Sequence, residues 1–177
     1  RHNRKIEYNT KSARFRYNAS IEKIIYSNER NLDRTKILRF AEVDYINRRE
    51  NILVTGSTGV GKSYIATALG YQGCIEGNRV MYFNFAKLFA KLKMAKADGS
   101  YLKELAKIEG QHLIILDDFG LHPMDNQSRL TFLEIIEYLH GKGSVIITSQ
   151  LPVSGWYDII GEKNTKTNFE NRIINLK

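Results

Sequence analysis

Residues 56–63 read GSTGVGKS and match the phosphate-loop pattern G-x-x-x-x-G-K-[ST] in full. The apolar run ILVT, residues 52–55, comes directly before the loop, and apolar residues at helical spacing follow it. Such a loop turns its backbone N–H groups inward around a phosphate, so a Cβ at Gly56 or Gly61 would obstruct the approach. A chance glycine-rich turn would need neither the strand before the loop nor the helix after it. The sequence therefore predicts a nucleoside triphosphate site.

Each part of the loop is expected to supply a different interaction. Lys62 reaches the β and γ phosphates as a point charge, and Ser63 offers its hydroxyl to Mg²⁺. The helix that starts near Gly61 directs its positive end at the anion. The residues expected to bind the nucleotide are Gly56, Ser57, Thr58, Gly59, Val60, Gly61, Lys62, Ser63 and Tyr64.

The composition of the 177 residues, 42% hydrophobic and 26% charged, is typical of a soluble globular domain. No apolar run approaches the length of a membrane helix, so no membrane partner is expected. Cys74 is the single cysteine, which excludes an internal disulfide and fits a reducing, cytoplasmic location. The N-terminus has neither an initiator Met nor a signal peptide, which is typical of a piece of a longer protein.

The net charge of +8 is concentrated near the N-terminus, where Glu7 is the only acid among residues 1–20. Aromatic residues alternate with the cations there, a mixture that suits nucleic-acid phosphates and bases. A solvated basic linker explains the same composition, and both interpretations stay open. We expect residues 1–33 to be a basic segment or linker from a truncated N-terminal domain, and residues 34–177 to form the nucleotide-binding domain.

Apolar periodicity alternates between strand and helix along the rest of the chain. Expected helices are residues 34–45, 62–76, 85–97, 101–109 and 127–139, and expected strands are residues 52–55, 79–83, 113–116 and 144–148. Such alternation predicts an α/β fold, a three-layer sandwich in which helices cover both faces of a parallel sheet. Ligand sites in such folds lie at the carboxyl ends of the strands.

Two adjacent acids end the third predicted strand. Asp117 is expected to hold the metal through water, and Asp118 to orient the attacking water or accept its proton. The fourth strand ends in TSQ, residues 148–150, at the same edge of the sheet. Gln150 is expected to position water near the γ-phosphate, although a simple strand-end turn before Pro152 is the alternative.

These residues resemble the IstB-like, DnaC-like ATPases of the AAA+ superfamily, particularly the helper proteins of two-gene insertion sequences. The resemblance is carried by residues 12–15 (SARF), 32–33 (LD), 51–56 (NILVTG), 98–101 (DGSY), 116–121 (LDDFGL), 147–152 (ITSQLP) and Trp156, together with the phosphate loop. It implies a P-loop AAA+ domain with ATP and Mg²⁺ as cofactors. It also implies that Lys62 and Ser63 belong to Walker A, that Asp117 and Asp118 are the Walker B pair, and that Gln150 is at the sensor position.

The resemblance has further implications for catalysis. Arg172 matches an arginine that is thought to act across a subunit boundary, and a surface arginine is the alternative. Asp118 stands where most AAA+ proteins have Glu, so ATP turnover is expected to be slow alone and stimulated by DNA and oligomerisation. The chain is expected to end before the family's C-terminal edge strand.

Lysines crowd the two helices predicted between residues 85 and 109, a region that resembles the family's insertion facing nucleic acid. A solubilising lysine face is the alternative. Phosphate contacts would make DNA binding independent of sequence and strongly dependent on salt. The lysines expected to contact DNA are Lys87, Lys91, Lys93, Lys96, Lys103 and Lys107.

The first hypothesis for function is an ATP-dependent DNA-binding helper of a transposase. ATP would close a helical or ring oligomer on duplex DNA, a recombinase would be recruited, and hydrolysis would dismantle the oligomer. A replicative helicase loader acting on single strands is the alternative in the same family. A small-molecule kinase or a non-catalytic nucleotide-binding adaptor would instead be indifferent to DNA.

Overall fold

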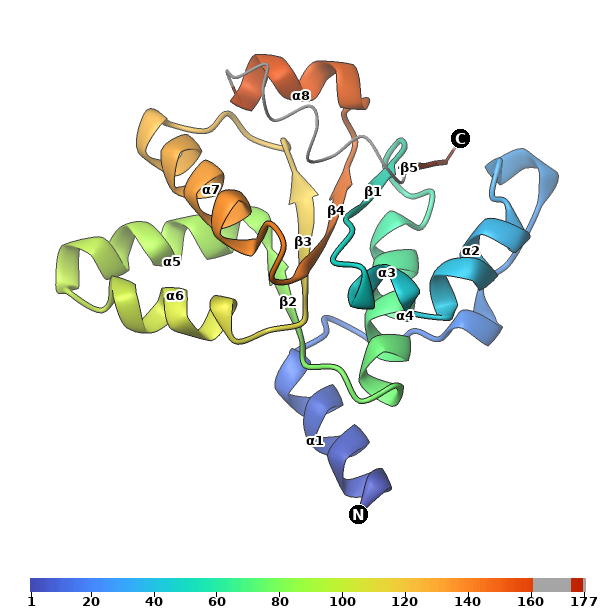
Figure 1. The fold of residues 1–177 in the computed structure, drawn as a ribbon. Helices are drawn as coiled ribbons and strands as arrows, with labels where there is room; N and C mark the ends of the chain where they lie inside the picture. The colour runs from blue at the N-terminus through green and yellow to red at the C-terminus, as the bar shows by residue number, and fades with distance from the viewer. Residues whose placement is uncertain (161–172, 177) are drawn as a thin grey trace.

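A five-stranded parallel sheet lies at the centre of the computed structural model (Figure 1). The structure describes residues 1–160 and 173–176. The strands are β1 (Ile52–Thr55), β2 (Val80–Asn84), β3 (Leu113–Phe119), β4 (Ser144–Ser149) and β5 (Ile173–Asn175), in the spatial order β2-β3-β4-β1-β5. Because β1 lies between β4 and β5, the loop that follows it emerges among the carboxyl ends of its neighbours.

Helices cover both faces of this sheet. The helices are α1 (His2–Ala13), α2 (Arg34–Ala41), α3 (Asp44–Asn47), α4 (Lys62–Ile75), α5 (Phe85–Asp98), α6 (Tyr101–Glu109), α7 (Asn126–Leu139) and α8 (Val153–Ile160), with 3-10 turns η1 (Ile21–Lys23) and η2 (Asn28–Arg30). Buried residues of α1, α2 and α4 join one core cluster, and those of α5 to α8 join a second. Figure 1 shows α4 and the group α5 to α7 on opposite sides of the sheet.

Successive strand residues belong to different core clusters. In β1, Ile52 and Val54 belong to the cluster beside α4, whereas Leu53 belongs to the cluster beside α5 and α7. In β3, Ile114 and Ile115 divide in the same way. Both faces of the central strands are therefore buried, as expected for a parallel sheet between two helical layers. The predicted three-layer α/β sandwich is confirmed.

The helix predicted over residues 34–45 is interrupted in the structure. α2 ends at Ala41 and α3 begins at Asp44. Between them, Val43 has a left-handed φ of 56°, which a continuous helix does not allow. The Val43 side chain is buried, so tertiary packing offsets a backbone conformation that is costly for a β-branched residue.

The first 33 residues contain more structure than their sequence pattern indicates. α1 and two 3-10 turns form there, and α1 contacts both α4 and β2. The buried residues Ala13, Ile21, Ile24 and Leu32 join the core cluster beside α4. Packing against the sheet domain, rather than a strong apolar periodicity, therefore orders this segment. The domain boundary after residue 33 stays a prediction.

The expectation that the C-terminal edge strand is missing is wrong. β5 pairs in parallel with residues 53–55 of β1 and forms one edge of the sheet. Side chains from the N-terminal half hold it there: Asn31 Nδ2 donates to the Asn175 carbonyl at 3.3 Å, and Lys36 Nζ donates to the Ile173 carbonyl. A strand of three residues is too short to give a periodic signal, so tertiary contacts decide it.

In the described part of the chain, no helix has both the length and the apolar character that crossing a bilayer requires.

Phe132 of α7 is fully buried, and its ring centroid lies 5.4 Å from that of Phe85 and 5.5 Å from that of Phe119. Phe132→Ala is expected to lower the free energy of unfolding by about 3–5 kcal/mol because it leaves a cavity in this cluster. Urea denaturation measures the change. Leu130→Ala on the exposed side of α7 is the control, with an expected change within about 0.5 kcal/mol. Equal stabilities of the two variants would contradict the assignment of this core.

Candidate nucleotide-binding site

The phosphate loop leaves the carboxyl end of β1 and leads into α4. Gly59 and Gly61 have left-handed φ angles of 82° and 94°, which favour glycine. A Cβ on Gly56 would lie 2.8 Å from the Leu176 carbonyl oxygen, and a Cβ on Gly61 would lie 2.5 Å from Nη2 of Arg30. Neighbouring protein atoms therefore leave no room for a side chain at either end of the loop. This crowding is a second reason for glycine there, besides the close approach of a phosphate expected from the sequence.

Lys62 begins α4 and turns back into the loop. Its Nζ donates a hydrogen bond to the Ser57 carbonyl at 2.7 Å, and only 6% of the residue is exposed. Burial lowers the pKa of Lys62, while the nearby charges of Asp118 and Asp117 act in the opposite direction. The ammonium group thus lies within the loop and within electrostatic range of both acids.

Three hydroxyl groups donate hydrogen bonds to Asp117, which is completely buried. Ser63 Oγ of α4 donates to Oδ1 at 2.7 Å, Thr148 Oγ1 of β4 donates to the same oxygen, and the Tyr82 hydroxyl of β2 donates to Oδ2. Burial and the hydrogen bond to Asp117 both raise the pKa of Tyr82, so the phenol stays a donor. The carboxylate is thereby fixed beside the first turn of α4.

A β-bulge interrupts the pairing of the two acids with β4. Leu116 pairs with Ile147 and Phe119 pairs with Ser149, so Asp117 and Asp118 together lie opposite one residue of β4. Asp118 has a left-handed φ of 64°. A bulge of this kind redirects side chains that would otherwise alternate between the two faces of the sheet.

Thr148 is the residue opposite the bulge, and its hydroxyl connects the two acids. It accepts the backbone N–H of Asp118 at 2.9 Å and donates to the Asp117 carboxylate. Burial and the charge of Asp117 raise the pKa of Asp118, whereas Arg16 and Lys62 oppose the increase. Asp118 is only partly buried, and it is among the residues that line a hollow beside α5.

The structure brings Lys62, Ser63, Asp117 and Asp118 together at the carboxyl edge of the sheet. Gln150 lies just beyond β4 at this edge, and its side chain is exposed. Arg172 lies outside the described residues.

Comparison with known proteins identifies the family. The sequence model of the family described as IstB-like ATP binding protein matches residues 1–176. This chain belongs to that family. A relative from Sinorhizobium fredii (strain NBRC 101917 / NGR234), named as the insertion sequence ATP-binding protein y4pL, is 38% identical over 174 residues, which cover 98% of this chain and 71% of the relative. The ATP-binding protein named for insertion sequence IS1162 of Pseudomonas fluorescens is 39% identical over 158 residues, covering 87% of this chain and 67% of that protein.

Solved structures share the fold of this IstB-like chain. The crystal structure of the DnaC helicase loader matches with a TM-score of 0.76 and 22% identity, covering 91% of this chain and 98% of that chain. AMPPCP-bound DnaA from Aquifex aeolicus matches with a TM-score of 0.77 and 18% identity, covering 90% and 50% respectively. The IstB-like chain therefore has the P-loop AAA+ fold.

Several residues beside the site had no clear signal in the sequence. Tyr82 lies in an apolar run that predicts a buried strand. Only the structure reveals the hydrogen bond from its hydroxyl to Asp117. The ring of Tyr17 stacks on Tyr64 with centroids 6.2 Å apart, and burial raises the pKa of the Tyr17 hydroxyl. Such residues are found only when the chain segments come together, because they lie outside any motif.

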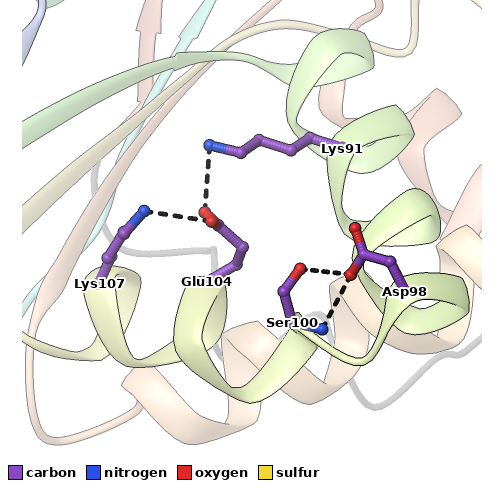
Figure 2. Close-up of polar contacts among 5 residues, drawn as sticks. All are labelled: Lys91, Asp98, Ser100, Glu104 and Lys107. Carbon is purple, nitrogen blue, oxygen red and sulfur yellow. Dashed lines mark hydrogen bonds and ion pairs between the residues drawn. The ribbon is translucent and has the colours of Figure 1, made fainter.

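Of the lysines predicted to contact DNA, Lys91 and Lys107 are paired with one acid. Figure 2 shows both ammonium groups directed at Glu104 of α6, each 3.1 Å from a carboxylate oxygen. These hydrogen bonds lower the pKa of Glu104. In the same view, Asp98 accepts a hydrogen bond from the Ser100 backbone N–H at 2.9 Å and so stabilises the turn between α5 and α6.

The remaining lysines of this region divide into two groups. Lys93 forms an ion pair of 2.9 Å with Asp125, and Lys96 Nζ donates to Thr131 Oγ1 at 2.7 Å, so both face α7. Lys87 and Lys103 are exposed. A hollow of about 260 Å³ beside β2 has Lys87, Lys91, Lys107 and Arg14 among its lining residues. The six lysines therefore do not form one continuous surface.

Thr148→Val removes the hydroxyl that connects the two acids and changes the side-chain volume little. The Asp118 N–H then loses its acceptor and Asp117 loses a donor, so the free energy of unfolding is expected to fall by about 1–3 kcal/mol. Urea denaturation measures this change. Thr148→Ser keeps the hydroxyl and is the matched control. If the valine variant were as stable as the serine variant, the bridging role would be wrong.

Proposed function

We propose that this chain binds and hydrolyses ATP, and that its ATP-bound form assembles on DNA as a helper of a transposase. The observation that carries the proposal is the convergence of Lys62, Ser63, Asp117 and Asp118 at the end of the phosphate loop. The family description, IstB-like ATP binding protein, supports ATP as the nucleotide.

The phosphate loop would bind the β and γ phosphates through its backbone N–H groups and the Lys62 ammonium. In the described structure this ammonium is hydrogen-bonded to the Ser57 carbonyl. A carbonyl is a weaker partner for an ammonium than a phosphate oxygen, because a hydrogen bond between two charged groups is stronger. Lys62 is therefore free to exchange one acceptor for the other when a triphosphate binds.

The residues beside the loop fit a Mg²⁺ ion. The Ser63 hydroxyl and the Asp117 carboxylate, 2.7 Å apart, are oxygen donors of the kind that Mg²⁺ takes. The described residues contain no cluster of three or more His, Cys, Asp or Glu side chains that could hold a metal, so phosphate and water oxygens would complete the coordination. When bound, the ion would neutralise charge on the β and γ phosphates.

Asp118 is the residue proposed to orient the attacking water and accept its proton. Its pKa is raised by burial and by Asp117, which makes its carboxylate a better proton acceptor while it remains ionised. The bulge and the hydrogen bond from its backbone N–H to Thr148 fix its direction. Gln150, exposed at the same edge, is proposed to help position this water.

Assembly would complete the site. We propose that Arg172 of a neighbouring copy supplies a guanidinium to the γ-phosphate, where charge develops during phosphoryl transfer. Arg172 directly precedes β5, the strand that pairs with β1. Hydrolysis would then depend on a helical or ring oligomer.

The proposed partner is a transposase, because the relatives y4pL and the IS1162 protein are named for insertion sequences. DNA is the second proposed partner, with the duplex favoured, and the lysines of α5 and α6 are the proposed phosphate contacts. A helicase loader is the alternative function. The alternative is favoured by the likeness in fold to the DnaC helicase loader and predicts stimulation by single strands alone.

Two variants separate ATP binding from hydrolysis. Lys62→Ala is expected to abolish ATP binding because the loop loses its cation. Asp118→Asn is expected to keep ATP binding while turnover falls by about 10²-fold or more, because the proton acceptor is lost. Nucleotide titration and phosphate release measure the two steps, and Asp44→Asn at an exposed ion pair is the control. Wild-type turnover in Asp118→Asn would remove Asp118 from the mechanism, and absence of ATP binding by the unmodified chain would refute the proposal.

DNA binding is tested with Lys87, which is exposed and lies at the hollow beside β2. Lys87→Gln is expected to weaken binding of any duplex sequence and to reduce the slope of log affinity against log salt by about 0.9 if one phosphate contact is lost. Fluorescence anisotropy across a salt series measures this slope. Lys142→Gln is the control for lost charge. In the unmodified chain the Lys142 ammonium lies 3.9 Å from the Tyr138 ring centroid. A salt-independent affinity of the unmodified chain would contradict phosphate binding.

A further inference from the structure

Arg30 lies at the end of η2, in the segment before the predicted domain boundary, and its side chain reaches the phosphate loop. Its Nη2 donates a hydrogen bond to the Val60 carbonyl at 2.7 Å, and its Nη1 donates to the Ile25 carbonyl at 2.5 Å. The guanidinium is therefore held between two carbonyl groups from segments far apart in the sequence. The residue is partly buried.

The contact uses a carbonyl of the loop and none of its N–H groups. A phosphate loop binds the anion through its N–H groups. Arg30 binds the Val60 carbonyl and crowds the adjacent Gly61 so closely that a Cβ there would lie 2.5 Å from Nη2. Because a guanidinium only donates hydrogen bonds, this contact does not compete with phosphate for the loop N–H groups.

Contacts from distant segments lie at the two ends of the loop, and its middle is open. A Cβ on Gly59, in its middle, would meet nothing within 4 Å, whereas one on Gly56 would contact Leu176. Glycine-rich segments lose much conformational entropy when they are ordered. A loop held in its bound shape before the ligand arrives avoids that cost at the moment of binding. Arg30 and Leu176 restrain the two ends of the loop.

Arginine suits this position for a physical reason. Its planar guanidinium presents several N–H donors in a fixed geometry, and hydrogen bonds from a charged donor are stronger than neutral ones. Lysine carries a single ammonium on a flexible chain, so it would hold both carbonyls less well.

We propose that Arg30 is a positioning residue for the triphosphate: it holds the phosphate loop in its binding shape through the Val60 carbonyl. This inference rests on the ATP binding proposed above. The adjacent Asn31 binds the Asn175 carbonyl of β5, so one short segment joins the loop to the edge strand. By linkage, a partner that displaces residues 25–31 weakens nucleotide binding, and bound nucleotide resists that displacement.

The test compares Arg30→Ala and Arg30→Lys with the unmodified chain by titration with Mg-ATP and with Mg-ADP. Arg30→Ala is expected to weaken both nucleotides by about tenfold, the scale of a lost charge-assisted hydrogen bond. The factor is expected to be equal for ATP and ADP because the loop cradles the β-phosphate that they share. Arg30→Lys is expected to have a nucleotide affinity between those of Arg30→Ala and the unmodified chain. Turnover of both variants at saturating ATP is expected to stay within about twofold of the unmodified chain, because Asp117 and Asp118 are unchanged.

Hydrogen exchange without nucleotide gives a second readout. Exchange of the amides of residues 57–62 is expected to accelerate in Arg30→Ala, because the loop opens more often. Arg48→Ala is the matched control: it removes the same charge at an exposed ion pair with Asp44 and is expected to leave affinity and loop exchange unchanged.

Three results would overturn the inference. Unchanged affinity in Arg30→Ala, with or without a lower melting temperature, would reduce Arg30 to a structural contact. A loss for ATP much larger than for ADP would make Arg30 a direct ligand of the γ-phosphate instead. Failure of the unmodified chain to bind either nucleotide would remove the proposed function itself, a result distinct from a failure confined to the Arg30 variants.

Discussion

The buried carboxylate of Asp117 is the constraint on which the rest of the structure depends. An ionised group without solvent contact is tolerated only when hydrogen bonds replace its water, and here the donors come from three elements: Ser63 of α4, Tyr82 of β2 and Thr148 of β4. These elements must meet at β3 for the charge to be satisfied. The strand order β2-β3-β4, with α4 against the sheet, fulfils this requirement.

The same requirement explains the irregularity in β3. Two consecutive residues of a regular strand point to opposite faces, so two adjacent acids would not both serve one ligand at the edge of the sheet. The bulge opposite Thr148 and the left-handed φ of Asp118 remove this alternation. Local backbone strain at such a position is typical of functional sites, where surrounding contacts offset its cost. The Thr148 hydroxyl therefore positions both acids, because it accepts from the Asp118 N–H and donates to the Asp117 carboxylate.

The phosphate loop joins this acidic centre to segments that lie far away in the sequence. Arg30 reaches the loop from the N-terminal segment, and Leu176, the residue after β5, lies close to Gly56. Residues before the predicted boundary at residue 33 thus contribute to the geometry of the site, although the phosphate loop and the acidic pair lie after it. The basic helices α5 and α6 lie across the sheet from α4, and most of their lysines are restrained by intramolecular contacts.

The sequence by itself determined the strand and helix alternation, the phosphate loop and the positions of Asp117 and Asp118, because each depends on spacing within one short segment. It did not reveal β5, the packing of residues 1–33, or the contacts of Tyr82 and Arg30. These features depend on segments distant in the chain, and a short strand or a lone polar residue carries no periodic signal. Only the tertiary structure decided them, because a hydrogen bond between remote residues exists only once the chain has closed the loops between them.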